Sequence, residues 1–323
     1  MNNAGPLISR RTALIGGGAG TAVLAMGGAA PVSAAAPQMG AAPIRYSRFM
    51  LGDLEITTLL DGEAFSEEPQ KTFGMNVDSA EFARVSEANF LPTDNFFNFF
   101  TPTLINTGKE LILFDTGLGE GARPGRGRTM SALEAAGYTP DQVDVVVLTH
   151  MHPDHILGLM ENGMPAYPNA RYVTGSKEYN FWSAQDPESN GVAKLVASHM
   201  TPLAEKTTFL DDGGSVVSGI TAMAAEGHTP GHMTYMLESS GKQLLLAADT
   251  ANHFVWSLGY PDWEVRFDMD KAMAAKTRRK VLSMLASDKI PFSGYHMPFP
   301  AVGFIEANGN GFRFVAESYQ LSL

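Results

Sequence analysis

The stretch Val143–His155, read as VDVVVLTHMHPDH, decides what kind of fold this chain can adopt. Its first half is an apolar run, typical of a strand buried on both faces. Its second half holds three of the 8 histidines in the 323-residue chain. His150 and His152 are two residues apart, so in an extended segment their side chains point the same way and can bind one cation. Asp154 and His155 follow at once, within reach of a second cation. Because a catalytic tetrahedral ion leaves one position open for water, four ligands indicate two metal ions.

Three more ligand-type residues follow apolar runs elsewhere in the chain. His228 comes after ITAMAA, Asp249 after LLLAA, and His296 after IPFSGY. Each is therefore expected where a strand ends, on a rigid element that suits a metal site. Asp249 is a natural bridge between two cations, since a carboxylate has two oxygens. A solvated loop with unrelated surface histidines is the alternative, but the repeated pattern favours a metal site.

Composition restricts the chemistry of such a site. The chain has no cysteine, which excludes disulfides, thiolate ligands and cysteine nucleophiles and leaves histidine and carboxylates as metal ligands. Its formal net charge of -11 argues against nucleic acid as a partner, because phosphate binding needs clustered Lys and Arg.

Strand and helix patterns alternate along the chain. Hairpins are predicted at Gly52–Asp53, Gly108–Lys109, Ser240–Gly241 and Asn308–Gly309. Ser79 is a possible cap for a helix over SAEFARVSEANF, and Asp268 or Asp270 lies near the cap of an amphipathic helix over DKAMAAKTRRKVLSMLAS. The charged run 278–280 in that helix is typical of a solvated face. Two groups of strands, each followed by helices, indicate an α/β fold of two packed sheets with helices outside.

The N-terminal segment 1–34 has the layout of an export signal. Paired arginines precede a weakly apolar, Gly- and Ala-rich stretch that ends in small residues. This pattern predicts a twin-arginine signal peptide cleaved after Ala34, and hence a periplasmic or secreted protein with no membrane attachment after cleavage. Residues 35–46 are rich in Ala and Pro and are predicted to be a flexible lead-in, and residues 47–323 to form the catalytic domain.

Several motifs together resemble a known family. THMHPDH matches the HxHxDH signature of the metallo-β-lactamase superfamily, and DTG (115–117), GHTPGH (227–232), Asp249 and His296 occur in that superfamily's order. Within it, FWSAQ, GHTPGHMTY and PFPAVGFIEANGNGFRFV resemble the branch that contains methyl parathion hydrolase, to which quorum-quenching lactonases are related. The resemblance implies a single-domain, four-layer αββα sandwich with two metal ions at one edge of its sheets.

The resemblance also implies a role for each matching residue. The first metal would be held by His150, His152 and His228, the second by Asp154, His155 and His296, with Asp249 as the bridge. Asp115 would orient a ligand histidine, and His232 would be structural. One departure is that relatives often have two glycines after the last histidine of the signature. Here Ile156 and Leu157 precede Gly158, so the loop beside the second metal is expected to differ in shape.

Seven such ligands predict a dinuclear, metal-dependent hydrolase. A hydroxide bridging the cations would attack a carbonyl carbon or phosphorus, with Asp154 and Asp249 as catalytic residues and the free oxygen of Asp154 as a proton shuttle. Zn²⁺ is the expected ion, although histidine and carboxylate ligands also suit Mn²⁺, Co²⁺ or Fe²⁺.

Aromatic residues near the site suggest an apolar substrate. By resemblance, Phe97 of DNFFNFF and Trp182 are predicted to line the substrate pocket, although most of these phenylalanines would be core. His253, four residues after Asp249, is expected either at the pocket rim or as the cap of a turn. The expected substrate is an apolar small molecule with an ester-type bond, namely a lactone, an aryl ester or a phosphotriester.

The sequence also allows two other functional classes and a homodimer. An iron-dependent oxidoreductase of the sulfur dioxygenase type would use one iron on the same fold, and a non-catalytic metal-binding protein would be expected to lose ligands. All seven ligand positions are filled here, which favours hydrolysis. A homodimer is possible, since relatives of this branch are often dimers.

Overall fold

The computed structural model describes residues 44–318, whose strands form two seven-stranded sheets. In order across the first sheet, the strands are β1 (Tyr46–Leu51), β2 (Leu54–Leu59), β5 (Thr103–Asn106), β6 (Leu111–Phe114), β7 (Val145–Leu148), β10 (Arg171–Gly175) and β11 (Thr207–Leu210). Across the second sheet they are β12 (Ser215–Val217), β13 (Ile220–Ala224), β14 (Met233–Ser239), β15 (Lys242–Ala248), β16 (Phe292–Gly294), β17 (Val302–Asn308) and β18 (Gly311–Ala316).

Several parallel strands end at the same edge of the sheets. In the first sheet β6, β7, β10 and β11 are parallel to one another, and in the second sheet β15 and β16 are a parallel pair. Ligand sites in α/β proteins form outside the carboxyl ends of parallel strands. Six of the seven predicted ligands follow β7, β15 and β16, and His228 follows β13, which runs in the same direction as β15 because both are antiparallel to β14. The topology itself therefore points to this edge.

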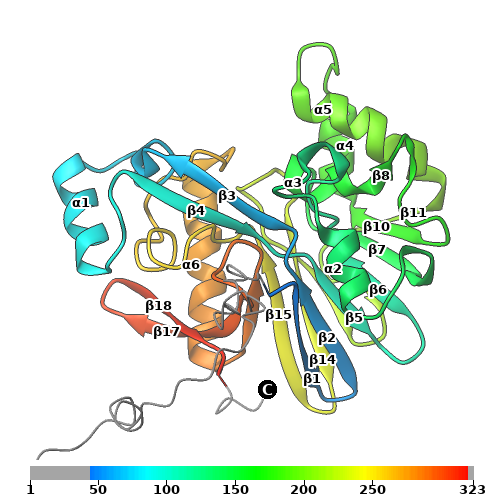
Figure 1. The fold of residues 1–323 in the computed structure, drawn as a ribbon. Helices are drawn as coiled ribbons and strands as arrows, with labels where there is room; N and C mark the ends of the chain where they lie inside the picture. The colour runs from blue at the N-terminus through cyan, green and yellow to red at the C-terminus, as the bar shows by residue number, and fades with distance from the viewer. Residues whose placement is uncertain (1–43, 319–323) are drawn as a thin grey trace, which may run out of the picture. The chain divides into compact units, whose positions relative to one another are not determined.

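Helices and two small strand pairs complete the fold (Figure 1). The helices are α1 (Ser79–Ala88), α2 (Thr129–Ala135), α3 (Pro153–Ile156), α4 (Ser176–Ser183), α5 (Gly191–Leu195) and α6 (Lys271–Asp288). The strand pairs are β3 (Gly62–Glu67) with β4 (Asn95–Phe100), and β8 (Met160–Glu161) with β9 (Met164–Pro165). Among the described residues, no helix combines the length and apolarity needed to cross a membrane.

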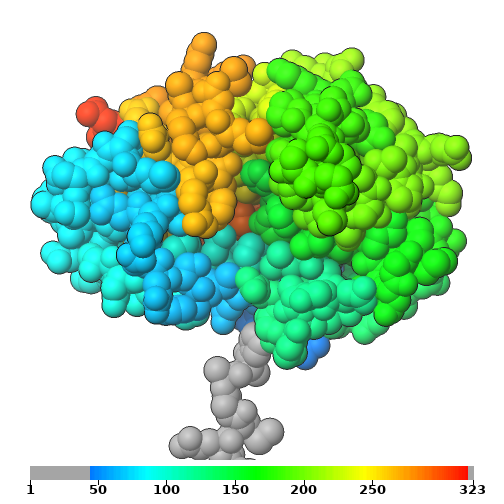
Figure 2. Space-filling model, turned by 90° about the horizontal axis from the view of Figure 1, so that it is seen from above, coloured from blue at the N-terminus to red at the C-terminus, as the bar shows by residue number. Residues whose placement is uncertain are grey.

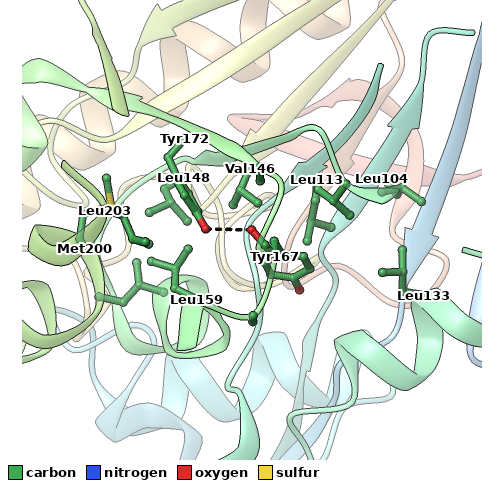
Figure 3. Close-up of a cluster of buried hydrophobic side chains, with 14 of the residues drawn as sticks. Leu104, Leu113, Leu133, Val146, Leu148, Leu159, Tyr167, Tyr172, Met200 and Leu203 are labelled. Carbon is green, nitrogen blue, oxygen red and sulfur yellow. Dashed lines mark hydrogen bonds between the residues drawn. The ribbon is translucent and has the colours of Figure 1, made fainter. Parts of the chain in front are cut away.

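The core of the sandwich consists of three apolar layers, and a fourth apolar cluster lies around Trp256 and α1. Strand β7 shows how two of the layers form. Its side chains alternate along the strand. Val145 and Val147 pack between the two sheets, whereas Val146 and Leu148 pack against the helices that cover the outer face of the first sheet. Figure 3 shows this outer layer, where the Tyr172 hydroxyl donates to the carbonyl of Tyr167 at 3.2 Å.

The opposite outer face is covered by α6. Side chains from α6 pack on the second sheet, among them Leu282 and Leu285 against Leu245 of β15. The result is the order helix, sheet, sheet, helix, and one compact unit holds all of the described residues. The predicted single-domain, four-layer αββα sandwich is confirmed.

Local predictions hold with small corrections. The hairpins form where expected, although the last one turns at residues 309–310 rather than at Asn308–Gly309. The cap of α1 is Asp78, which accepts from the Glu81 amide at 2.8 Å, so the prediction of Ser79 was one residue late. Asp270, rather than Asp268, caps α6.

The N-terminal predictions fall almost entirely outside the described residues. The signal peptide and most of the lead-in belong to residues 1–43. The first strand, β1, begins at Tyr46, the last residue of the predicted lead-in.

Candidate metal centre

The structure brings all seven predicted ligands together at one edge of the two sheets. They form two groups of donors, His150, His152, His228 and Asp249 in one and Asp154, His155, Asp249 and His296 in the other. Within each group the donor atoms lie within 4.8 Å of one another. Asp249 belongs to both groups, as a bridging carboxylate would.

The signature segment is partly helical rather than a simple extended loop. His150 follows β7, and His152 has an extended backbone that precedes α3. Pro153 occupies the first turn of α3, where its missing N–H costs nothing. Asp154 and His155 therefore lie on a helical turn. The turn directs them to the second donor group, while His150 and His152 serve the first.

Asp115 orients two histidines through Thr149. Its carboxylate accepts from the Thr149 amide and hydroxyl at 2.9 Å each, and lies 2.8 Å from Nδ1 of His155. Because the Thr149 hydroxyl gives its one proton to Asp115, it accepts from Nδ1 of His150, 3.1 Å away. Both imidazoles direct Nε2 toward Asp249, and in their neutral forms this is the unprotonated nitrogen. The role that resemblance implied for Asp115 matches this geometry.

Two further histidines are oriented in the same manner from distant elements. Nδ1 of His228 donates to Asp268 at 2.9 Å, and Nδ1 of His296 donates to the carbonyl of Phe99 in β4 at 2.7 Å. A hydrogen bond on one ring nitrogen fixes the tautomer and makes the other nitrogen a better ligand. His152 differs, since its Nδ1 is the atom that faces the centre, 2.9 Å from Nε2 of His228.

Asp268 is itself held by a buried arginine that sequence reasoning misread. Arg278 is 1% exposed and pairs with Asp268 at 2.6 Å, while its other nitrogens donate to the carbonyls of Thr250 and Pro261. The prediction of a solvated face at 278–280 is therefore wrong for Arg278. Position 278 lies on the face of α6 that packs inward, because it falls at helical spacing from Ala274 and Leu282.

Unpartnered polar atoms show that the residues fit cations. Among the described residues, Nε2 of His150, Nε2 of His155 and Oδ1 of Asp249 are buried without a hydrogen-bond partner. Buried polar atoms are normally satisfied, because leaving them unpaired costs free energy. Cations bound to these atoms would remove that cost. Imidazole nitrogens and carboxylate oxygens without thiolates also match the donor set of divalent zinc and its neighbours.

Burial and local charge shift the pKa values of these donors in different directions. Burial lowers the pKa of His152 to about 3 and that of His150 well below its usual value, so both stay neutral. Burial opposes ionisation of Asp249, but the imidazoles of His296 and His155 outweigh it and hold its pKa well below the usual range. Burial also opposes ionisation of His155, His228 and His296, but neighbouring carboxylates outweigh it and raise their pKa. Neutral imidazoles and ionised carboxylates are the ligating forms, so a bound cation would replace a proton at these three histidines.

Strained backbone marks two strand ends that lead to the centre. Asp115 has φ 58°, and Ala248, directly before Asp249, has φ 44°. Left-handed backbone at residues other than glycine costs about 1–3 kcal/mol and persists where surrounding contacts require it. The neighbouring His232 supplies one such contact, because its Nε2 accepts from the Asp249 amide at 3.1 Å while Nδ1 bonds to the carbonyl of Ala225. His232 is thus structural, as predicted.

Glu178 of α4 joins the two ligand-bearing loops, and sequence reasoning did not find it. Its carboxylate accepts from the Met151 amide and the Trp182 indole on one oxygen, and from the Thr229 hydroxyl and Gly231 amide on the other, at 2.7–2.9 Å. Gly231 has to be glycine, because a Cβ there would lie 2.2 Å from the amide nitrogen of Glu178. In the sequence, Glu178 was marked only by its position one helical turn before Trp182.

A cavity of about 400 Å³ opens beside the ligands. Figure 2 shows the hollowed face, between the orange and green segments. Apolar residues that line the cavity are Ala64, Phe96, Phe100, Leu118, Pro153 and Phe267. Four of the ligands reach its wall, namely His152, Asp154, Asp249 and His296. The arrangement is a mainly apolar chamber with a metal centre in its wall.

None of the three predicted pocket residues lines this cavity. Trp182 is 3% exposed within the outer core, where its indole donates to Glu178. Phe97 is 51% exposed, because side chains alternate along β4 and its neighbours Phe96 and Phe100 face the cavity instead. His253 stacks on Trp256, and its Nδ1 accepts from two backbone amides, so it caps a turn.

The departure at Ile156 and Leu157 has a structural basis. Ile156 is fully buried in the outer core, and Leu157 lies at the start of a short 3₁₀ turn over Leu157–Leu159. Gly158 packs closely on the loop after β6, which contains Asp115. A Cβ at Gly158 would lie 2.0 Å from the Thr116 carbonyl oxygen. Gly158 is therefore required. The two positions before it hold the apolar residues Ile156 and Leu157 where relatives often have glycine.

Comparison with known proteins agrees with this geometry. An N-acyl homoserine lactonase from Bacillus sp is 27% identical over 204 residues, 56% of this chain and 75% of the relative. A lactonase of the same kind from Bacillus thuringiensis is 26% identical over 163 residues, 44% of this chain and 60% of the relative. These alignments cover only part of each protein.

Solved structures match over more of the chain. The dizinc quorum-quenching lactonase AidC superposes with a TM-score of 0.79 at 27% identity, covering 85% of this chain and 98% of that chain. The hydrolase AbOPH superposes with a TM-score of 0.78 at 26% identity, covering 86% and 99%. Residues 101–291 match the family described as the metallo-beta-lactamase superfamily, a segment that contains six of the seven ligands. The chain therefore belongs to the metallo-β-lactamase superfamily.

Proposed function

We propose that this protein is a hydrolase with two divalent metal ions that cleaves lactones or esters of apolar small molecules. The observation that carries the proposal is the pair of four-donor groups that share Asp249 and face an apolar cavity. The names of the relatives support the lactone as a substrate class, since they include lactonases and a dizinc enzyme. Zinc is the proposed metal.

The bound ions would lower the pKa of a water shared between them to near neutral and stabilise negative charge that develops on the reacting oxygens. The protein's own residues prepare the site for that chemistry. Asp249 and the histidines hold the donors in place, and the apolar wall excludes bulk water, which strengthens electrostatic interactions inside. Asp154 lies in the cavity wall, with Oδ2 3.5 Å from Nε2 of both His155 and His296. We propose that its other oxygen accepts the proton released in hydrolysis.

A metal count combined with a substrate panel tests the proposal. Purified protein is expected to contain about two equivalents of zinc per chain by mass spectrometry. It should hydrolyse hexanoyl homoserine lactone or dihydrocoumarin faster than paraoxon, and 4-nitrophenyl acetate measurably. Treatment with dipicolinate should abolish all of these activities, and adding zinc should restore them.

Other results would point elsewhere. One iron per chain with oxygen uptake in the presence of a glutathione persulfide would overturn hydrolysis in favour of the oxidoreductase. Two bound metals with no turnover of any ester, lactone or phosphotriester would favour a binding protein.

We also propose that the protein is exported, on the strength of the N-terminal pattern alone. Changing Arg10 and Arg11 to lysine should keep the full-length chain in the cytoplasm of a bacterial host. The unchanged chain should appear, shortened, in the periplasmic fraction on an immunoblot. Equal distribution of both forms would contradict twin-arginine export. A homodimer likewise remains a proposal, and light scattering of the same preparation would measure the molar mass that decides it.

A further inference from the structure

Two arginines line the cavity beside the metal centre. Arg126, in the loop between β6 and α2, and Arg266, shortly before α6, both belong to its wall. Among the described residues, neither guanidinium has an ion pair or a side-chain hydrogen bond. Six of the other nine described arginines pair with carboxylates, whereas Arg45, Arg84 and Arg128 have no carboxylate partner but lie outside the cavity wall. Carboxylate partners are present for Arg48, Arg123, Arg171, Arg278, Arg279 and Arg313.

The carboxylates that line the same cavity do not neutralise these arginines. They are Asp154 and Asp249, and both are predicted metal ligands. Two divalent ions carry four positive charges against the two negative charges of these side chains. With Arg126 and Arg266 added, the loaded cavity lining would stay positive even when the hydroxide needed for hydrolysis is counted, in a protein of formal net charge -11. A chamber of this sign attracts an anion.

The backbone that carries Arg126 is rigidly held. Asp61, which is fully buried, accepts from the amides of Leu118, Gly127 and Thr129 at 2.9–3.2 Å and from the Thr129 hydroxyl at 2.6 Å. Gly127 has φ 69°, and a Cβ there would lie 1.8 Å from a backbone oxygen. The loop therefore has little freedom on either side of Arg126. A guanidinium on a fixed backbone loses less entropy when it binds a ligand.

The backbone at Arg266 is held as well, although its side chain is exposed. Its amide donates to the carbonyl of Thr72 at 2.8 Å, and its carbonyl accepts from Lys271 at 3.0 Å. The guanidinium carbon lies 4.7 Å from the ring centroid of Phe267, a cation–π contact with another residue that lines the cavity. Two residues later, Asp268 is held by His228 and Arg278, so the segment is tied to the metal centre itself.

We infer that the substrate is an ester or lactone that also bears a carboxylate, with Arg126 and Arg266 binding the carboxylate while the ester-type bond lies at the metal centre. The planar guanidinium of arginine can donate two parallel hydrogen bonds to the two oxygens of a carboxylate. A substrate that ends in a neutral alkyl group offers no such acceptor. The apolar wall would take the hydrocarbon between the two ends. This inference rests on the proposed hydrolysis and revises the expectation of a wholly apolar substrate.

A matched pair of esters tests it. The probes are mono-4-nitrophenyl glutarate, which carries a free carboxylate, and its methyl ester, which is neutral and longer by one methyl group. For the unchanged protein, kcat/KM is expected to be about 10- to 100-fold higher for the acid, chiefly through a lower KM, since hydrogen bonds to charged groups contribute that much. The acid's advantage should shrink as salt rises from 0.05 to 0.5 M, because screening weakens charge attraction.

Substitutions locate the effect. Arg126→Met and Arg266→Met should each lower the ratio of acid to methyl ester kcat/KM by about tenfold, and Arg126→Lys and Arg266→Lys, which keep the charge, should recover part of it. Arg84→Met is the matched control. Arg84 is exposed on α1 and does not line the cavity, so removing its charge should leave the ratio unchanged. Thermal melts of every variant identify any that fail to fold, and the lysine variants retain the test in that case.

Failure of the carboxylate inference and failure of the proposed hydrolysis give different results. Equal kcat/KM for both esters, or a ratio that the methionine variants leave intact, would overturn the carboxylate inference while hydrolysis stands. A protein that contains its metals and hydrolyses neither ester nor any lactone would overturn the proposed function, and the inference with it.

Discussion

Replacing Asp249 by alanine is expected to abolish hydrolysis, with kcat/KM falling by about 10³-fold or more. Asp249 is the one residue that belongs to both donor groups, so its loss removes a ligand from each. The five imidazoles would then face two cations with Asp154 as the remaining carboxylate. Metal content measured by mass spectrometry should fall from about two equivalents to one or fewer.

The matched control for this experiment is Asp262→Ala. Asp262 lies thirteen residues further along the chain and pairs with Arg279 at the surface, away from the metal centre. The control removes the same carboxylate without touching a ligand, so metal content and kcat/KM should stay within twofold of the unchanged protein. If Asp249→Ala retained two metals and full activity, the shared site proposed here would be wrong. Circular dichroism separates this outcome from unfolding.

Replacing Glu178 by alanine is expected to cause the largest loss of stability of any single change at the site. Four donors now bond to one buried carboxylate, and all four would lose their acceptor. Leaving buried donors unpaired costs about 1–3 kcal/mol each, less what water entering the cavity recovers, so a loss of about 3–5 kcal/mol is expected. For a chain of this size the melting temperature should fall by roughly 10 °C.

Two further variants show whether the hydrogen bonds are the cause. Glu178→Gln keeps the shape and one acceptor oxygen, but its NH₂ group would face two donors, so it should recover only part of the stability. Glu188→Ala removes an exposed carboxylate after the same helix and should change the melting temperature by less than about 1 °C. Differential scanning calorimetry measures all three. A Glu178→Ala protein as stable as the original would show that the two ligand loops do not depend on this carboxylate.

The ligands themselves were predictable because their signal is local. A buried strand followed by closely spaced histidines states both the position and the chemistry of His150, His152 and His155, and His228, Asp249 and His296 repeat the pattern. The alternation of apolar residues likewise predicted the two sheets and most hairpins. In each case the deciding interactions lie within a few residues along the chain.

The residues that support the ligands were not predictable from such patterns. Glu178 contacts groups 27 and 53 residues away, and the hydrogen bond between Asp268 and His228 spans 40. Asp268 looked like a helix cap and Arg278 like a solvated charge, because each is an ordinary polar residue in its local context. The pocket predictions failed for a related reason. Which side of β4 faces the cavity, and whether Trp182 is buried, depends on the segments that pack against them.

By itself, the sequence predicted the fold class and the seven candidate ligands, because hydrophobic periodicity and family motifs depend on residues that are close along the chain. Only the tertiary structure decided how those ligands are oriented, which side chains line the cavity, and that Arg126 and Arg266 face it without carboxylate partners. Orientation and charge pairing depend on atoms that folding brings together from segments distant along the chain.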